Sequence, residues 1–199
     1  MKTKVLNKSE RTRQFIIEKT APIFNTKGYA GTSLSDITAA TGLTKGSVYG
    51  NFKNKDEVAV SAFKFNLNKL LLLIANEQSQ KKTFKEKLLC FPELYLNFLG
   101  EKFPVGGCPI MNTAIEADDT HPQLKEIAKK AILSWNENLI YLINKGKEQN
   151  EFKATTMADE KALMIIALIE GTVMLTKLTG NTNHLKTLMA NLKLQIEEF

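Results

Sequence analysis

A short polar segment, residues 44–51 (TKGSVYGN), carries side chains that could read a nucleic acid. If it forms a helix, Lys45, Gly46, Ser47, Tyr49 and Asn51 face outward. Lysine, serine and asparagine on such a face can donate hydrogen bonds to base edges and phosphates in a major groove. The same pattern also fits a tight helical corner in any all-helical protein.

The two glycines in this segment bear on the choice. Gly46 and Gly50 each cost about 1 kcal/mol of helix propensity relative to alanine. That cost makes sense where the backbone must approach another surface closely.

Two short helices must position this segment. Ser33 and Asp36 predict a capping box that opens a helix ending near Thr41. Gly42 suits the left-handed turn that stops it, and Thr44 caps a second helix over about 45–51. The apolar residues spaced to hold the pair together are Ile37, Leu43, Val48 and Phe52. The pattern predicts a helix-turn-helix.

Helical periodicity extends over almost all of the remaining chain, and strand signals are scarce. A first helix is expected from a Ser9 cap to Lys27, stopped by Gly28, with Pro22 able to kink it. Later helices are expected over 54–78, opened by Asn54 and Glu57, from Thr83 to Phe98 with a bend at Pro92, over 110–117, after His121-Pro122, over 159–177 and over 183–198. Residues 100–109 have the composition of a loop.

Composition bounds the class of protein. The chain has 199 residues, 43% of them hydrophobic, and two cysteines, so it can bury a core and has no disulfide framework. Residues 1–13 are polar and basic, unlike a signal peptide, and the apolar stretch 162–169 is too short to span a bilayer. We therefore expect a cytoplasmic protein with no membrane partner.

The net charge of +6 is concentrated at the start of the chain, where residues 1–60 carry +5 of it. This bias suggests an anionic partner for the first segment, although a solvated lysine-rich surface would give the same count. A basic arm could add nonspecific phosphate contacts or could be a disordered tail. Its residues are Lys2, Lys4, Lys8, Arg11 and Arg13.

Other reactive side chains give weaker patterns. Cys108 lies in a Gly-Gly-Cys-Pro sequence with only Lys102 as a nearby cation, so a structural thiol is favoured over a redox or electrophile sensor. Glu116, Asp118, Asp119 and His121 resemble a set of metal ligands. Asp119 or Thr120 before His-Pro is, however, what a helix start looks like, and we expect capping and no metal or other cofactor.

The stretch from Gly28 to Lys55 resembles the TetR family of bacterial transcriptional regulators. The matching residues are Gly28-Tyr29, Thr32 to Ile37 (TSLSDI) and Gly42 to Lys55 (GLTKGSVYGNFKNK). The resemblance extends over about residues 10–60 at the level of motifs, and over the rest in helix count and length. It implies a three-helix DNA-binding head on a helical body that binds a ligand and dimerises.

The resemblance also implies roles for individual residues. Lys45, Gly46 and Ser47 would open the recognition helix toward base edges, and Thr44 and Tyr49 would reach phosphates. Lys55 would meet the DNA backbone at the start of the fourth helix. Thr32 or Ser33 would cap the second helix and touch phosphate. The sequence departs from the family's pattern at Pro22, Thr38 and Gly50-Asn51, and the last departure bears on base specificity.

Aromatic and methionine side chains in the second half of the chain would suit a flat or greasy effector, although at helical spacing such residues also form ordinary core. The candidate lining residues are Phe63, Leu67, Phe91, Tyr95, Phe98, Met111, Trp135 and Leu139.

The sequence thus predicts an all-α protein of about nine helices, with a DNA-binding domain over 1–55 and an effector-binding and dimerisation domain over 56–199. The expected function is sequence-specific transcriptional regulation. The protein would be a homodimer through about 159–198, released from a near-palindromic operator by a small molecule. One alternative is a helical dimerisation or small-molecule-binding protein without DNA binding. An all-helical enzyme is a weaker alternative, because His121 and His184 belong to no recognisable catalytic set.

Overall fold

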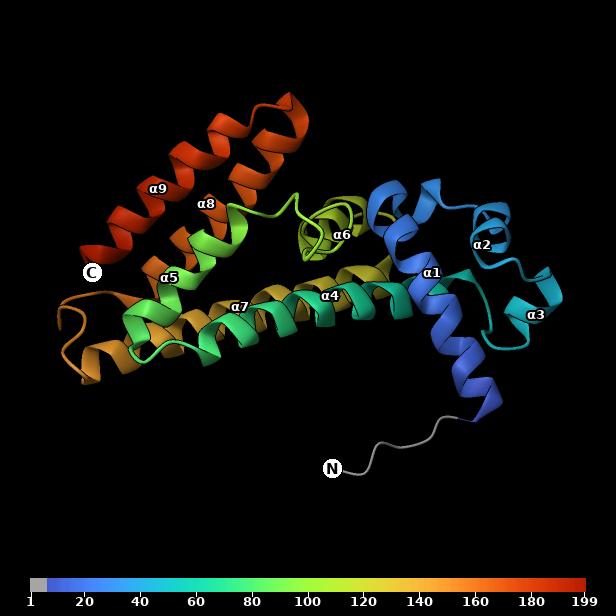
Figure 1. The fold of residues 1–199 in the computed structure, drawn as a ribbon, viewed down its shortest axis with the longest axis horizontal. Helices are drawn as coiled ribbons and strands as arrows, with labels where there is room; N and C mark the ends of the chain where they lie inside the picture. The colour runs from blue at the N-terminus through green and yellow to red at the C-terminus, as the bar shows by residue number, and fades with distance from the viewer. Residues whose placement is uncertain (1–6) are drawn as a thin grey trace. The chain divides into compact units, whose positions relative to one another are not determined.

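Side-chain caps begin several of the helices of this chain. The computed structural model describes residues 7–199, and within them it contains helices and no strand (Figure 1). The prediction of an all-α fold is confirmed. The helices are α1 (Lys8–Gly31), α2 (Leu34–Thr41), α3 (Lys45–Tyr49), α4 (Lys55–Ser79), α5 (Phe84–Tyr95), α6 (Pro109–Ala117), α7 (Pro122–Glu148), α8 (Ala158–Thr179) and α9 (Thr182–Glu197).

The first helix differs from the prediction at its start and agrees at its break. Asn7, not Ser9, is the N-cap. Its side chain accepts from the Glu10 N–H, and the Glu10 carboxylate accepts from the Asn7 N–H, which completes a capping box. The chain passes Pro22 with helical backbone angles, whereas Gly28 interrupts the helix at φ +74° and ψ −179°. Pro22 has no N–H to donate to the carbonyl of Glu18, one turn earlier, and Glu18 is an exposed residue.

The starts of α5 and α4 and the end of α5 agree with the sequence predictions only in part. Thr83 opens α5 with a capping box to Glu86. Asn54 accepts from the Glu57 N–H, but the Glu57 carboxylate bonds to the Lys53 N–H, so the reciprocal half of the predicted box is absent there. The helix expected to reach Phe98 ends at Tyr95, and Phe98 follows in a turn.

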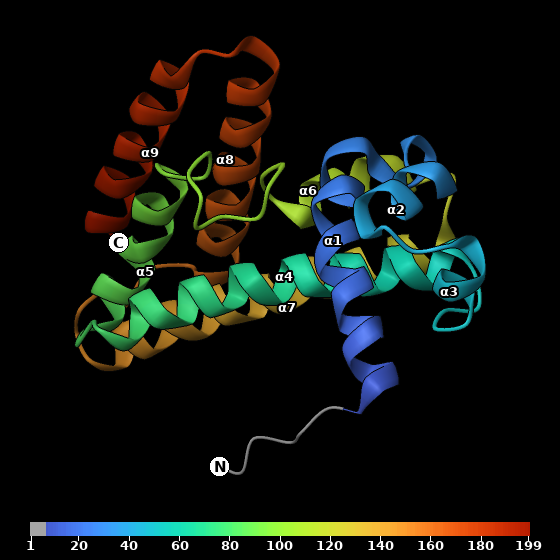
Figure 2. The same cartoon turned by 45° about the vertical axis from the view of Figure 1, so that its right-hand side comes forward.

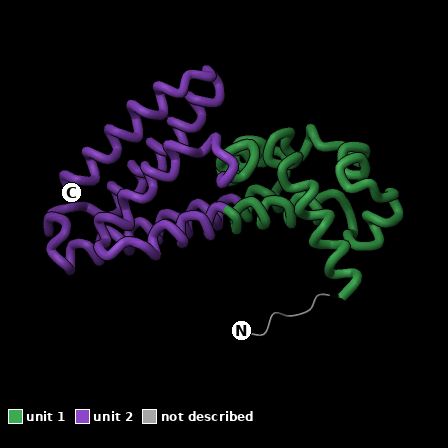
Figure 3. The backbone as a smooth tube through the Cα atoms, viewed as in Figure 1, with its two compact units in different colours: residues 1–69, 104–127 green, residues 70–103, 128–199 purple. Residues whose placement is uncertain are grey.

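The chain divides into two compact units (Figure 3). Unit 1 contains residues 1–69 and 104–127, and unit 2 contains residues 70–103 and 128–199. This division differs from the predicted boundary between residues 55 and 56, because α6 and the loop before it pack with α1.

Unit 1 is built around α1, which contacts both α2 and α6. Its core contains Ile16 and Phe24 from α1, with Ile37, Val48 and Phe52 from the helix-turn-helix. Unit 2 packs α9 against α8 and α5, and Figure 2 shows α8 and α9 side by side. Aromatic rings fill part of its core: Trp135 stacks on Tyr95 and on Phe91, each with ring centroids 6.1 Å apart.

Gly28 gives a testable measure of how tightly α1 and α6 fit together. Its backbone angles lie in a region that essentially only glycine populates, and an added Cβ would lie 2.3 Å from a Glu116 carboxylate oxygen. Gly28→Ala should lower the free energy of unfolding by about 2–3 kcal/mol. Gly42→Ala is the matched control, because Gly42 has φ +68° with nothing within 4 Å of the added Cβ. It should cost about 1–2 kcal/mol, for backbone strain alone. Urea denaturation measures both, and an equal loss would show that the contact with Glu116 carries no energy.

Candidate nucleic-acid interface

The two helices of the helix-turn-helix are held by caps and by a buried apolar contact. Ser33 Oγ accepts from the Asp36 N–H at 3.1 Å, and Gly42 ends α2 at φ +68°. Thr44 Oγ1 accepts from the Ser47 N–H at 3.2 Å and so begins α3. Below them Ile37 and Val48 are fully buried, and Leu43 packs against the same core. The predicted caps, turn and core of this motif are confirmed.

The outer side of α3 is polar and accessible. Thr44, Lys45 and Gly46 are exposed, and Ser47 and Tyr49 are half-buried. The Thr44 hydroxyl accepts the capping bond, which leaves its proton available to donate. An added Cβ at Gly46 would meet no atom closer than 4.0 Å, so space lies open above this turn of the helix.

Arg13, on α1, links the turn that follows α3 to the first turn of α4. Its guanidinium donates to the Asn51 carbonyl at 2.6 Å and to a Glu57 carboxylate oxygen at 2.7 Å, and it lies 4.0 Å from the centre of the Phe52 ring. The Lys53 N–H and Arg13 together lower the pKa of Glu57. Arg13 is therefore a structural link, which corrects its expected place in a phosphate-binding arm. Lys8 and Arg11 are exposed on α1, and Lys2 and Lys4 lie outside the described residues.

The start of α4 carries a second polar cluster. The Tyr29 hydroxyl donates to Asp56, and the Lys55 ammonium lies 4.2 Å from the centre of the Tyr29 ring. The His121 ring meets Tyr29 edge-on with centroids 4.5 Å apart, and its Nε2 lies 3.6 Å from Asp56. These contacts hold the Lys55 side chain at the first turn of α4, beside the recognition segment in sequence.

The α6 segment is joined to α1 by directional hydrogen bonds. The Glu116 carboxylate accepts from the Tyr29 and Ala30 N–H groups, each at 2.7 Å, just after the break at Gly28. Asn25 donates to the Val105 carbonyl at 2.7 Å, and Asn112 donates to the Asn25 carbonyl at 3.0 Å. These bonds join residues 80 to 87 positions apart, and spacing along the chain gave no signal for them.

Comparison with known proteins identifies this architecture. A family model described as "Bacterial regulatory proteins, tetR family" matches residues 16–62, and one described as "Tetracyclin repressor-like, C-terminal domain" matches residues 85–192. The chain belongs to the TetR family. It is a DNA-binding transcriptional regulator, as its sequence predicted.

Similar proteins span nearly the whole chain. The crystal structure of a TetR-family transcriptional regulator from Cytophaga hutchinsonii is 48% identical, covers 97% of this chain and 96% of that chain, and has a TM-score of 0.93. A TetR transcriptional regulator from Chloroflexus aurantiacus is 36% identical, with 96% of each chain covered and a TM-score of 0.90. The HTH-type transcriptional repressor DhaR of Mycobacterium sp. (strain GP1) is 24% identical over 87% of this chain and 86% of its own length.

The predicted DNA-binding residues of this TetR regulator fall into three groups. Thr44, Lys45 and Gly46 with Ser33 are exposed, while Ser47, Tyr49, Asn51 and Lys55 are half-buried. Thr32 is fully buried and donates its hydroxyl to the Gly28 carbonyl at 2.6 Å, so the expectation that it touches phosphate is wrong.

Two other predicted residues are already engaged within the protein. Ser33 donates its hydroxyl proton to Asp36 at 2.8 Å, so it has no proton left for a phosphate. The Asn51 amide donates to the Ser47 carbonyl at 2.9 Å, and its oxygen accepts from Ser9. Lys53 is exposed between α3 and α4 and is a further cation on this side of the head that the sequence analysis did not select.

A cavity of about 520 Å³ lies within unit 2. The predicted effector residues lie outside the set that lines it. Phe91, Tyr95, Phe98, Trp135 and Leu139 are instead buried core, because aromatic and branched side chains at helical spacing pack against one another. Leu67 and Met111 belong to unit 1, as does Phe63, which lines a cavity of only about 20 Å³ there.

The residues considered as metal ligands have other roles. Glu116 accepts the backbone bonds described above, and Asp118 pairs with Lys125 at 2.9 Å. His121 Nδ1 accepts from the Leu124 N–H at 3.2 Å, so His121 caps α7 and the expectation of Asp119 or Thr120 as the cap is wrong. No group of His, Cys, Asp or Glu suited to hold a metal lies within residues 7–199. Cys90 and Cys108 are buried and form no disulfide.

Tyr29 gives a pH prediction for the cluster at the start of α4. The hydrogen bond to Asp56, together with burial, raises the pKa of Tyr29 to about 12. The folded value lies above the unfolded value of about 10, so the stability that Tyr29 contributes is complete below pH 10 and is lost as the pH rises toward 12. Phenolate absorbance after a rapid pH jump should show a late-titrating component that Tyr29→Phe removes. Asp56→Asn should make it titrate earlier, and an unchanged titration would show that Asp56 does not control it.

Proposed function

We propose that the protein is a homodimeric repressor that binds a near-palindromic operator and releases it when a small molecule binds in unit 2. The observation that supports DNA recognition is the exposed polar side of α3, held outward by the buried contact of Ile37 with Val48. A helix in this position can enter a major groove, where a lysine reads guanine and a serine reads several bases.

Each residue has a proposed part in this interface. Lys45 and Ser47 contact base edges, and Gly46 allows the backbone to approach them. Thr44, Tyr49 and Lys55 contact phosphates, with the charge of Lys55 placed at the N-terminus of α4. Asn51 acts through its bonds to Ser47 and Ser9, which orient α3.

The homodimer is supported by the unusual surface of α8. The exposed apolar side chains Leu163, Met174 and Leu178 are 60%, 46% and 82% accessible and share one face of the helix. Leu194 on α9 is 60% accessible. Apolar surface of this extent marks an interaction site, and a second copy of the same face would cover it.

The same helix meets the length and composition of a membrane span, as does α4, although core helices of soluble proteins pass the same test. We assign the apolar surface of α8 to the dimer, with the protein in the cytoplasm, because the family consists of transcriptional regulators that act on DNA.

The cavity in unit 2 is the proposed effector site. Its volume of about 520 Å³ lies in the range of small-molecule sites. For the ligand to release DNA, it must bind more tightly to a conformation with low operator affinity than to the DNA-bound one. Repression is supported by the relative described as a transcriptional repressor.

Selection from a pool of random duplexes, followed by gel shifts with the selected sequence, tests this function. A near-palindrome should be enriched, and its complex should survive competitor DNA. The logarithm of the binding constant should fall linearly with that of the salt concentration between about 50 and about 200 mM. A pool with no enriched sequence would support the alternative of a dimerisation or ligand-binding protein without DNA binding.

A further inference from the structure

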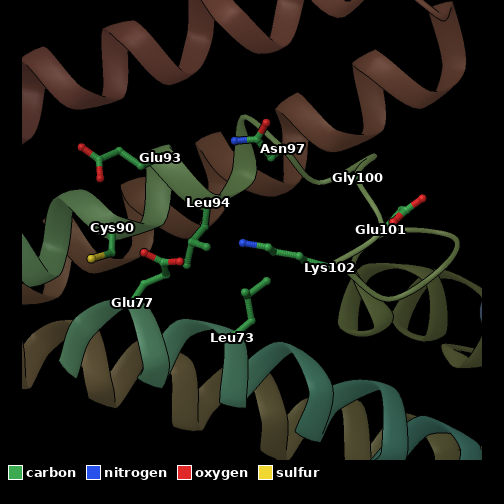
Figure 4. Close-up of a pocket in the computed structure, with 9 residues that line it drawn as sticks. All are labelled: Leu73, Glu77, Cys90, Glu93, Leu94, Asn97, Gly100, Glu101 and Lys102. Carbon is green, nitrogen blue, oxygen red and sulfur yellow. The ribbon is translucent and has the colours of Figure 1, made fainter. Parts of the chain in front are cut away.

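The cavity in unit 2 has walls from α4, α5 and the connection that follows α5 (Figure 4). Its lining residues are Leu73, Glu77, Cys90, Glu93, Leu94, Asn97, Gly100, Glu101 and Lys102. A site of this kind holds the body of a ligand on apolar side chains and orients it with a few polar groups. The chemistry of the polar groups therefore indicates the class of ligand.

The apolar part of the lining comes from Leu73 on α4 and from Leu94 and Cys90 on α5. Cys90 is 1% exposed, and its thiol donates to the Glu86 carbonyl at 3.4 Å. Burial raises the pKa of the Cys90 thiol, so the sulfur is neutral and contributes a soft apolar surface and no reactive thiolate. Binding to this wall is non-covalent.

The charged groups of the lining differ in whether they already have partners. Glu93 lies 3.8 Å from the Lys81 ammonium and 3.9 Å from that of Lys193, so its charge is compensated. Glu101 also has an interaction within the protein, whereas Glu77 and Lys102 have no ion-pair partner among residues 7–199. They extend into the cavity from different walls, Glu77 from α4 and Lys102 from the connection after α5 (Figure 4).

We propose that the effector is a zwitterion, an organic molecule with a protonated amine and an anionic group on an apolar body, held between Glu77 and Lys102. The inference rests on the proposed function, in which this cavity binds the effector. Glu77 pairs with the amine, Lys102 pairs with the anion, and Leu73 and Leu94 contact the apolar body. The Asn97 amide supplies a further hydrogen bond at the edge.

A ligand with one charge would satisfy only half of this site. An amine alone leaves the exposed Lys102 without an ionic partner, and a carboxylate alone leaves the half-buried Glu77 without one. Hydrogen bonds between oppositely charged groups are stronger than those between neutral groups, so a ligand that makes both contacts should bind more tightly than one that makes only one of them. The zwitterion also keeps the net charge of the site unchanged on binding.

A series of ω-amino acids of increasing chain length, with the alkylamine and the alkanoate of equal length, tests this assignment by calorimetry on the full chain. The best ω-amino acid should bind at least about tenfold more tightly than either singly charged probe. Glu77→Gln should lower its affinity to that of the alkanoate, and Lys102→Met should lower it to that of the alkylamine. Glu93→Gln is the matched control and should change affinity little, because Glu93 is already paired.

Each other outcome overturns the proposal. Equal affinity for the amine and the ω-amino acid would make the effector a cation, and equal affinity for the alkanoate would make it an anion. Failure of all the probes to bind, or an equal loss with Glu93→Gln, would remove the assignment of Glu77 and Lys102. Operator binding by the same variants is measured in parallel: if it persists, only the effector class is wrong, and if the unmodified chain binds no operator, the proposed function fails.

Discussion

Replacing Tyr49 and Lys55 together with alanine should lower operator affinity by about 100-fold, while the fold and the dimer persist. Tyr49 is half-buried at the end of α3, and Lys55 begins α4 with its ammonium over the Tyr29 ring. Both side chains are proposed to reach the DNA backbone, Tyr49 from the end of α3 and Lys55 from the start of α4. Their loss removes two phosphate contacts and leaves the buried Val48 and Phe52 in place.

The salt dependence of binding separates a DNA contact from a folding defect. Each lost lysine–phosphate contact should reduce the slope of the logarithm of affinity against that of salt by about 1, uniformly across sequences. Lys129→Ala with Tyr141→Ala is the matched control, because it removes the same two residue types from exposed positions on α7. Gel shifts measure the slope, and circular dichroism checks the fold. An unchanged affinity in the Tyr49 and Lys55 variant would place the DNA elsewhere.

Introducing glutamate at Leu163 and Leu178 should convert the protein to a monomer and lower operator affinity by about 100-fold or more. Both side chains are largely exposed in the single chain, so the substitutions cost little within it. In a dimer they would bring like charges into an apolar contact, which desolvates them without partners. Two linked heads bind about 100- to 10,000-fold more tightly than one, and the monomer loses this gain.

Sedimentation measures the oligomeric state, and gel shifts with whole and half operators measure the affinity. The control places glutamate at Leu72 and Leu133, which are 55% and 51% exposed on other helices. That variant should remain dimeric and bind the whole operator normally. A dimer that survives glutamate at Leu163 and Leu178 would show that α8 is not the interface.

Much of the head could be predicted because its signals are local. The capping box of Ser33 with Asp36, the left-handed Gly42 and the cap at Thr44 each depend on residues within a few positions. The burial of Ile37 and Val48 follows from helical periodicity. The caps and the turn depend on residues close together in the sequence, so they can be predicted without knowing the long-range contacts.

The error at Arg13 comes from contacts between residues distant in sequence. Arg13 belongs to a basic segment that could bind phosphates. Its hydrogen-bond partners, Asn51 and Glu57, lie about 40 positions away and could not be identified from the local sequence. The resemblance to the family predicts an exposed Thr32. Its side chain is instead buried, with the hydroxyl donating to the Gly28 carbonyl four positions earlier.

The residues proposed for the effector site give no signal in the periodicity of the sequence. At helical spacing a buried aromatic stripe is more often ordinary core than a ligand site, and Trp135, stacked on Phe91 and Tyr95, is buried in unit 2. The cavity instead has Glu77 and Lys102 in its walls. In the sequence, these two residues look the same as charged residues on a solvated surface.

Methylation interference on the selected operator tests the central claim that the outer side of α3 reads the major groove. Methyl groups on guanine N7 project into the major groove, and those on adenine N3 project into the minor groove. The account predicts that guanine N7 methylation within two symmetric half-sites blocks binding, and that Lys45→Ala relieves the dependence on that guanine. Interference confined to adenine N3, or a Lys45 variant with unchanged base preference, would contradict it.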